Sequence, residues 1–125
     1  MIRHAFSIAA LALALTAATS AEAAGDAAKG KAVFAQCAAC HKADASSKNT
    51  IGPNLWKVVG RTSGTLPGFN YSPAMKGAKK VWNDAALDAY LTNPMQAIPG
   101  NRMPFAGLKA APDRQNVIAY LKTLK

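Results

Sequence analysis

Apolar side chains recur at the three- to four-residue spacing of a helix in three stretches of the chain, residues 26–36, 81–92 and 112–124. The apolar positions in these stretches are Val33, Phe34, Leu87, Tyr90, Leu91, Val117, Ile118, Leu121 and Leu124. The sequence has neither the alternation of apolar and polar residues that marks a strand nor an internal repeat. The pattern therefore predicts an all-α fold with three main helices.

Residues at the ends of these stretches support the helix boundaries. Asp26 and Asn83 are suited to cap the first two helices, and Pro112 is suited to a first helical position. We expect Asn93-Pro94 to end the second helix, because the residue before a proline is disfavoured in a helix. Gly30 lies inside the first helix, where glycine costs roughly 1 kcal/mol relative to alanine. We interpret it as a point of close approach by another helix, with a tolerated weak position as the alternative.

The stretch between the first two helices, residues 42–71, is rich in Gly, Pro, Asn, Ser and Thr. Gly52-Pro53-Asn54 and Pro67-Gly68 mark turns within it. A segment this long without regular structure is uncommon in a small domain unless it serves a functional site. We therefore expect long loops that wrap around a bound group.

The first 23 residues are typical of an export signal. Arg3 lies near the start, residues 5–18 form an apolar run, and Ala21-Glu22-Ala23 is a small-x-small cleavage pattern. The run is shorter than the about 20 apolar residues that cross a membrane. We expect a signal peptide over residues 1–23, one domain over residues 24–125, and a soluble periplasmic protein after cleavage. An uncleaved membrane anchor is the alternative.

The chain is basic, with 15 Lys and Arg against 6 Asp and Glu and a formal net charge of +9. Removal of residues 1–23 would take away Arg3 and Glu22, so the charge would stay at +9. A basic surface attracts acidic protein surfaces and speeds their encounter. Export and the spread of lysines along the sequence argue against nucleic acid as the partner.

The two cysteines of the chain lie in the run Cys37-Ala38-Ala39-Cys40-His41. Two thiols at this spacing can form thioether links to two neighbouring vinyl groups of one haem, and the imidazole directly behind them can bind its iron. Covalent c-type haem attachment is therefore the leading hypothesis. The chain is also alanine-rich, so we expect a flat apolar cofactor to supply part of the core and the haem-free chain to unfold.

Three other sites use the same residue types as this motif. A structural zinc site needs a further ligand, and the only other histidine, His4, lies in the segment expected to be removed. A thioredoxin-like redox pair requires a βαβ context, and no β-branched run flanks Cys37. A structural disulfide stays open for an exported chain, although it would leave His41 unexplained.

A methionine thioether is the candidate for a second iron ligand, because soft sulfur favours reduced iron. Three methionines would remain after cleavage, Met75, Met95 and Met103. Methionine is more often a flexible core residue than a ligand. Met103 departs from this default, since it lies in a loop bounded by Pro and Gly and not on a helical apolar stripe. We favour Met103 as the distal ligand, with Met95 as the second choice.

Several further motifs occur together with the cysteine motif, in the order and approximate spacing found in one family. They are Gly52-Pro-Asn-Leu55, Gly60-Arg61, Pro67-Gly-Phe-Asn-Tyr71, Trp82, Tyr90-Leu-Thr-Asn-Pro94, Ile98-Pro-Gly-Asn-Arg-Met-Pro-Phe105 and Ile118-Ala-Tyr-Leu-Lys122. In these motifs the chain resembles the class I cytochromes c, close to the mitochondrial and α-proteobacterial type. The resemblance covers almost all of residues 24–125.

The resemblance implies a cytochrome c fold, with three main helices and long loops wrapped around one covalent haem c. It implies His41 and Met103 as the axial iron ligands, with the Pro53 carbonyl accepting the His41 ring N–H. The other residues that match haem-contacting positions are Arg61, Tyr71 and Trp82, for a propionate, and Tyr90, for the methionine sulfur. Ordinary packing is the alternative for each. Gly30 and Phe34 match a helix contact with Val117 and Tyr120.

The function implied is that of a monohaem electron carrier and not an enzyme, because two axial ligands leave the iron no open position. We expect a monomer that docks transiently on acidic surfaces of redox proteins, such as a membrane quinol–cytochrome c reductase, an oxidase, a reaction centre or a dehydrogenase. Two alternatives stay open. One is a haem-based gas sensor or peroxidase-like enzyme, which requires a labile Met103, and the other is a dedicated electron-accepting subunit of one dehydrogenase.

The charge departs from that of strongly basic family members, which carry several lysines around the exposed haem edge. At such positions this chain has Ala32, Thr50, Met95, Gln96 and Ala110, whereas Lys48, Arg102 and Lys109 keep the charge. Other lysines that contribute to the net charge are Lys76, Lys79, Lys80, Lys122 and Lys125. We therefore expect a thinner ring of charge at the haem edge than the net charge suggests.

Overall fold

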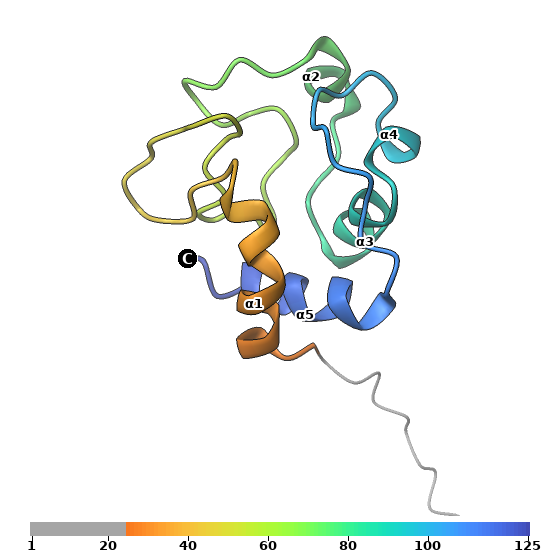
Figure 1. The fold of residues 1–125 in the computed structure, drawn as a ribbon. Coiled ribbons are helices and arrows are strands. Elements are labelled where there is room, and N and C mark those ends of the chain that lie inside the picture. Colours follow the sequence, from red (N-terminus) through yellow and green to blue (C-terminus); the bar gives the residue numbers. More distant parts are fainter. Residues whose placement is uncertain (1–24) are drawn as a thin grey trace, which may run out of the picture.

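The computed structural model describes residues 25–125, so the expected signal peptide and its cleavage after Ala23 lie outside the described residues. Within these residues five helices follow one another (Figure 1). They are α1 (Ala27–Ala38), α2 (Pro73–Ala78), α3 (Asp84–Thr92), α4 (Pro94–Ala97) and α5 (Ala111–Leu121). Regular strands do not occur in the described part, where β pairing consists of one isolated bridge between Thr62 and Val81. The prediction of an all-α fold is confirmed.

The three main helices begin close to the predicted positions. The Asp26 carboxylate accepts the Lys29 backbone N–H at 3.0 Å, and the Asn83 side chain accepts that of Ala86 at 2.8 Å. The second helix starts after Asn83 and not at residue 81, because residues 81 and 82 pair with the long loop: the Trp82 N–H donates to a loop carbonyl at 2.9 Å. The last helix ends at Leu121, three residues earlier than predicted.

Two short helices, α2 and α4, were absent from the sequence-based prediction. Each is preceded by a capping side chain that accepts a backbone N–H of the first turn, Ser72 for α2 and Asn93 for α4. Each also begins with proline, whose fixed φ angle suits the first helical position. Asn93-Pro94 therefore ends α3, as predicted, and starts α4 at the same point.

Helices α1 and α5 cross at close range, at the lower end of the molecule in Figure 1. A Cβ atom on Gly30 would lie 1.8 Å from the backbone oxygen of Asn116, so only glycine fits at this point of α1. One turn further along, the rings of Phe34 and Tyr120 pack with their centroids 5.1 Å apart. The close approach predicted for Gly30 is confirmed.

Helix α5 also packs on α3, and one partly buried arginine supports this contact. Arg114 pairs with Asp88 of α3 at 2.8 Å and donates to the carbonyls of Leu108 and Lys109 at 2.9 and 3.0 Å.

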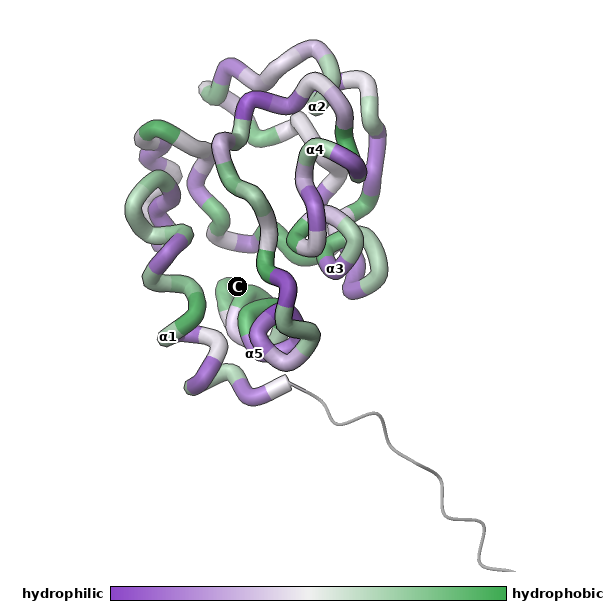
Figure 2. The backbone as a smooth tube through the Cα atoms, turned by 45° about the vertical axis from the view of Figure 1, so that its right-hand side comes forward, coloured by the Kyte–Doolittle hydropathy of each residue, from purple (hydrophilic) through white to green (hydrophobic). Residues whose placement is uncertain are grey.

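Figure 2 shows hydrophobic and hydrophilic residues interspersed along the helices and loops. Of the helices within residues 25–125, none combines the length and apolar character needed to cross a membrane.

Candidate functional site

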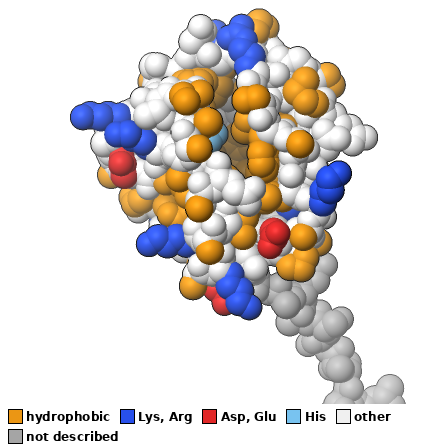
Figure 3. Space-filling view, viewed as in Figure 1, with side chains coloured by type: hydrophobic (Ala, Val, Ile, Leu, Met, Phe, Trp, Pro, Cys, Tyr) orange, Lys and Arg blue, Asp and Glu red, His pale blue; other side chains and the backbone are white. Residues whose placement is uncertain are grey.

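A cavity of about 380 Å³ lies between the three main helices and the loops that join them. Its mouth is visible as a hollow flanked by hydrophobic side chains, and Lys and Arg side chains stand further out, toward the edge of this face (Figure 3). Its apolar lining residues include Phe34, Leu55, Val58, Phe69, Trp82, Leu87, Leu91, Phe105, Val117 and Leu121. The walls therefore suit a large apolar group.

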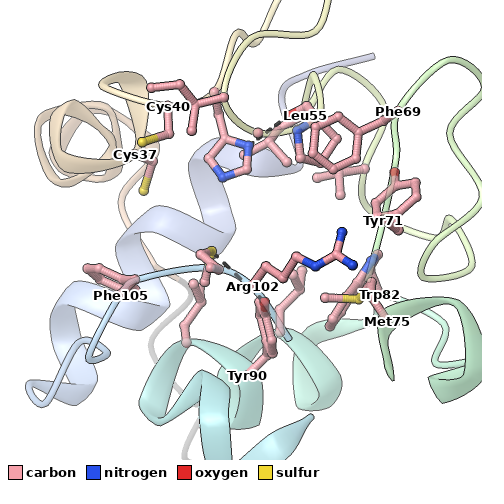
Figure 4. Close-up of a pocket in the computed structure, with 18 of the residues that line it drawn as sticks. Cys37, Cys40, Leu55, Phe69, Tyr71, Met75, Trp82, Tyr90, Arg102 and Phe105 are labelled. Atoms are coloured by element: carbon pink, nitrogen blue, oxygen red, sulfur yellow. Dashed lines mark hydrogen bonds between the residues drawn. The ribbon is translucent and has the colours of Figure 1, made fainter. Parts of the chain in front are cut away.

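The cysteine motif lies at one end of this cavity. Cys37 belongs to the last turn of α1, and the chain then turns tightly, with the backbone N–H groups of Cys40 and His41 both donating to the Cys37 carbonyl at 3.0 and 2.9 Å. This turn brings Cys37 and Cys40 side by side, as free thiols, on the cavity lining (Figure 4). Burial and the neighbouring Cys40 raise the pKa of Cys37, so its thiol stays protonated at neutral pH.

The imidazole of His41 is fixed by contacts on two sides. Its Nδ1 lies 2.7 Å from the Pro53 carbonyl oxygen. A carbonyl can only accept, so Nδ1 carries the proton and Nε2 keeps its lone pair. Gly52 lies against the ring, where a Cβ atom would come within 2.5 Å of Cε1. Burial lowers the pKa of His41, and the bond to Pro53 offsets only part of this effect, so the ring stays neutral.

The three methionines occupy different environments. Met103 lines the cavity, and the Tyr90 hydroxyl lies 3.9 Å from its sulfur. Burial raises the pKa of Tyr90 to about 12, so the hydroxyl keeps its proton. Met95 lies outside the lining and is 51% exposed. Met75, for which sequence analysis gave only packing as the default, also lines the cavity, near Tyr71 and Trp82 (Figure 4).

Arg61 brings a half-buried positive charge to the same cavity. Its guanidinium donates to the backbone carbonyls of Trp56 and Asn54 at 3.3 Å each. The ion pairs of residues 25–125 involve other side chains, so no carboxylate neutralises this charge there. Burial lowers the pKa of Arg61, although an arginine stays protonated at neutral pH. An anion that reached this part of the cavity would supply the missing partner.

Tyr71 and Trp82, which resemblance had suggested as propionate-binding residues, are buried and line the cavity beside Arg61. Burial raises the pKa of Tyr71, whose hydroxyl accepts the Leu66 backbone N–H at 3.3 Å. The Trp82 ring packs on that of Tyr90 with centroids 5.1 Å apart. All nine residues predicted for the site therefore come together on one cavity: Cys37, Cys40, His41, Pro53, Arg61, Tyr71, Trp82, Tyr90 and Met103.

These side chains fit a haem c. Two free thiols and an imidazole with an available lone pair lie at one end, a thioether is present in the lining, and the apolar walls suit a porphyrin. The uncompensated charge of Arg61 suits a propionate. By contrast, within residues 25–125 no three side chains of His, Cys, Asp or Glu gather closely enough to hold a metal ion, so zinc would lack ligands there.

Several residues of the site were not identified from the sequence. Leu87 and Leu91, and likewise Val117 and Leu121, are separated by four positions on one helix face, and both pairs line the cavity. Their spacing predicts the helices but does not indicate that these side chains line a site. Gly52 was assigned to a turn, and its contact with the histidine ring had no signal in the sequence.

Comparison with known proteins identifies relatives over almost the whole described chain. The family model described as cytochrome c matches residues 27–125. Cytochrome c2 of Rhodomicrobium vannielii is 48% identical over 119 residues, which are 95% of each chain. Cytochrome c of Euglena viridis is 49% identical over 81% of this chain and 99% of its own. The structure of cytochrome cH from Methylobacterium extorquens superposes with a TM-score of 0.75 at 40% identity, over 79% of this chain and 99% of that one.

Proposed function

The chain belongs to the cytochrome c family, and from that premise we propose that it holds a haem c between His41 and Met103 and carries electrons in the periplasm. Its fold is the all-α cytochrome c fold, its cofactor is haem c, and its activity is electron transport. The observation that carries the proposal is that two free thiols, an oriented imidazole and a thioether all line one apolar cavity.

Each side chain has a separate task in this proposal. Cys37 and Cys40 form the thioether links, and the tight turn after α1 holds them at the spacing that two vinyl groups require. His41 is the proximal ligand, and its bond to the Pro53 carbonyl keeps Nε2 free and the ring orientation fixed. When bound, haem c supplies an iron that alternates between two oxidation states.

Met103 is the distal ligand in this proposal. Its loop brings it to the cavity, the Tyr90 hydroxyl lies at its sulfur, and a soft thioether stabilises reduced iron. Met95 is half exposed outside the lining, so it is a weaker candidate. Met75 lines the same cavity and is the alternative that an experiment has to exclude.

If His41 and Met103 both bind the iron, the protein would be an electron carrier and not a catalyst, because substrates and gases would then find no open coordination site. The apolar lining supports this role as well. It keeps water away from the iron ligands, so that their positions would change little when the iron is oxidised or reduced. A gas sensor or peroxidase-like enzyme would instead need Met103 to leave readily.

Partners with acidic surfaces suit the net charge of +9. On the face with the cavity mouth, hydrophobic side chains flank the hollow and the cationic ones stand spaced apart toward the edge (Figure 3). We therefore propose transient docking through a mixed apolar and basic face on redox proteins at the membrane. The export signal expected over residues 1–23 supports the proposal that this exchange takes place in the periplasm.

The ligand assignment is tested by absorption spectra of the exported, haem-loaded protein. We expect the oxidised wild type to show the methionine–iron charge-transfer band, and Met103→Ala to lose it and to bind carbon monoxide rapidly when reduced. Met95→Ala and Met75→Ala are matched controls that should keep the band. Loss of the band in Met75→Ala alone would move the ligand to Met75. A wild type without the band would favour the sensor or enzyme.

A further inference from the structure

The side chain of Asn101 joins three backbone groups near Met103. Asn101 is buried and lies in the loop that leads from α4 to α5. Its Nδ2 donates to the carbonyls of Pro94 and Ile98 at 2.9 Å each. Its Oδ1 accepts the backbone N–H of Met103 at 2.8 Å. One amide therefore connects the backbone of Met103 to the short helix α4.

The chemistry of these partners fixes which way the amide points. The two carbonyls can only accept and the Met103 N–H can only donate, so the amide nitrogen must face α4 and the oxygen must face Met103. An ionised aspartate could not donate to the carbonyls, and an alanine would leave all three backbone groups without this partner. The arrangement therefore requires a side chain that both donates and accepts.

The rest of the loop offers Met103 little other backbone support. Pro104, the next residue, has no N–H to donate. The Phe105 N–H donates back to the Met103 carbonyl at 2.8 Å, which is a contact within the loop itself. The far end of the loop is anchored separately, where the Leu108 N–H donates to Leu91 of α3 at 2.7 Å. Asn101 is thus the anchor nearest to Met103, two residues away from it.

We propose that Asn101 is a positioning residue that keeps Met103 at the cavity by tying its backbone to α4. The inference rests on the proposed ligation by Met103. Without the amide, the segment from residue 101 to the anchor at Leu108 can swing outward at a lower free-energy cost, because the bonds that oppose this movement are lost. External ligands would then replace the thioether more easily, although the three main helices would be unaffected.

The test measures how readily imidazole displaces Met103 from the oxidised, haem-loaded protein, with the methionine charge-transfer band as the signal. For Asn101→Ala we expect a roughly tenfold increase in apparent imidazole affinity, since one buried polar network is lost. Protection of the Met103 amide against hydrogen exchange should fall by a similar factor. Asn101→Thr, whose hydroxyl can accept from Met103 and donate to one carbonyl, should lie between Asn101→Ala and the wild type.

Asn83→Ala is the matched control. It deletes an asparagine that caps α3 through the Ala86 N–H, far from the Met103 loop in sequence, and so lowers overall stability without touching this network. Imidazole affinity should stay at the wild-type value in this variant. Equal affinities for Asn101→Ala and Asn83→Ala would overturn the positioning role. If Asn101→Ala fails to fold, the same comparison is made with Asn101→Thr, where threefold tighter imidazole binding than in Asn83→Ala supports the role and equality overturns it.

Failure of the underlying function would look different. If the wild type lacks the charge-transfer band, or if Met103→Ala keeps it, the proposed ligation itself is wrong. If the wild-type band depends on Met103 but imidazole affinity is unchanged by substitution of Asn101, ligation by Met103 stands and only the positioning role is refuted.

Discussion

Gly30→Ala is the substitution that most directly tests the packing of α1 on α5. The added Cβ would lie 1.8 Å from the Asn116 backbone oxygen and 2.9 Å from the Tyr120 Cβ. Ordinary contact begins at 3.4 Å, so the helices would have to separate by about 1.6 Å at the crossing. The obstructing atom is a helix carbonyl, which cannot rotate away as the end of a flexible side chain could. The strain must therefore spread into the whole helix pair.

The size of the effect follows from three contributions. Overpacking against backbone should cost about 3 kcal/mol, the upper end of the usual range. Separation of the helices also weakens the contact between the Phe34 and Tyr120 rings, for which about 1 kcal/mol is typical. Alanine regains about 1 kcal/mol through its higher helix propensity. The free energy of unfolding should therefore fall by about 3 kcal/mol, a large share of the 5–15 kcal/mol typical of a domain.

The assay is urea unfolding of the haem-loaded protein, followed by far-ultraviolet circular dichroism. Gly77→Ala is the matched control, because Gly77 also lies in a helix but a Cβ there would meet nothing within 4 Å. This control should be unchanged or more stable by up to about 1 kcal/mol. If Gly30→Ala is as stable as the wild type, the close crossing of α1 and α5 is not what the chain adopts in solution.

Three further outcomes are expected. Replacing Cys37 and Cys40 by alanine should prevent haem attachment and abolish the cooperative thermal transition in circular dichroism, because the apolar walls of a cavity of about 380 Å³ would then face water and not a porphyrin. Hydrogen bonds from the hydroxyl and the backbone N–H of Ser46 hold the pKa of Asp44 below its ordinary value of 3.8. Asp44→Asn should therefore be less stable than the wild type in urea at pH 7. This difference should vanish as the pH falls through the pKa of Asp44 in the folded protein and the carboxyl becomes protonated. Arg114→Ala should cost about 1–3 kcal/mol in urea unfolding, because it removes a partly buried ion pair and two hydrogen bonds to carbonyls. Lys122→Ala, from an exposed pair, should cost less than about 1 kcal/mol, and equal losses would contradict this ranking by burial.

The sequence was sufficient where a local rule decides the structure. Asp26 and Asn83 cap their helices as expected, because an N-cap depends only on the next three residues. Helices α2 and α4 were missed because six and four residues are too few to show a periodic apolar face. A serine or asparagine directly followed by proline was nevertheless present before both, and this pair would have identified them.

The residues of the candidate site likewise fall into those that could be predicted from the sequence and those that could not. The cysteine motif could be recognised because its residues are adjacent in the sequence and their chemistry depends on that spacing. Met75 was judged by the default for methionine, and the fold brings it to the cavity from a helix that was not predicted. The role of Asn101 was not recognised, since it depends on the carbonyls of Pro94 and Ile98, which the path of the chain from α4 to residue 101 brings beside the amide. Contacts of this kind are visible only after the chain is folded.

The spacing of apolar residues in this sequence does not distinguish residues that pack in the protein core from residues that line the cofactor site, because the same residues form both. Leu87, Leu91, Val117 and Leu121 follow helical spacing, and that spacing only requires an apolar neighbour, whether a second helix or a porphyrin. The distinguishing signal is the amount of apolar bulk: an alanine-rich chain has helical stripes but too few large side chains to fill the space between them. Such a chain must either collapse or receive its core from outside, so the shortage of core predicts a bound apolar group before any ligand is identified.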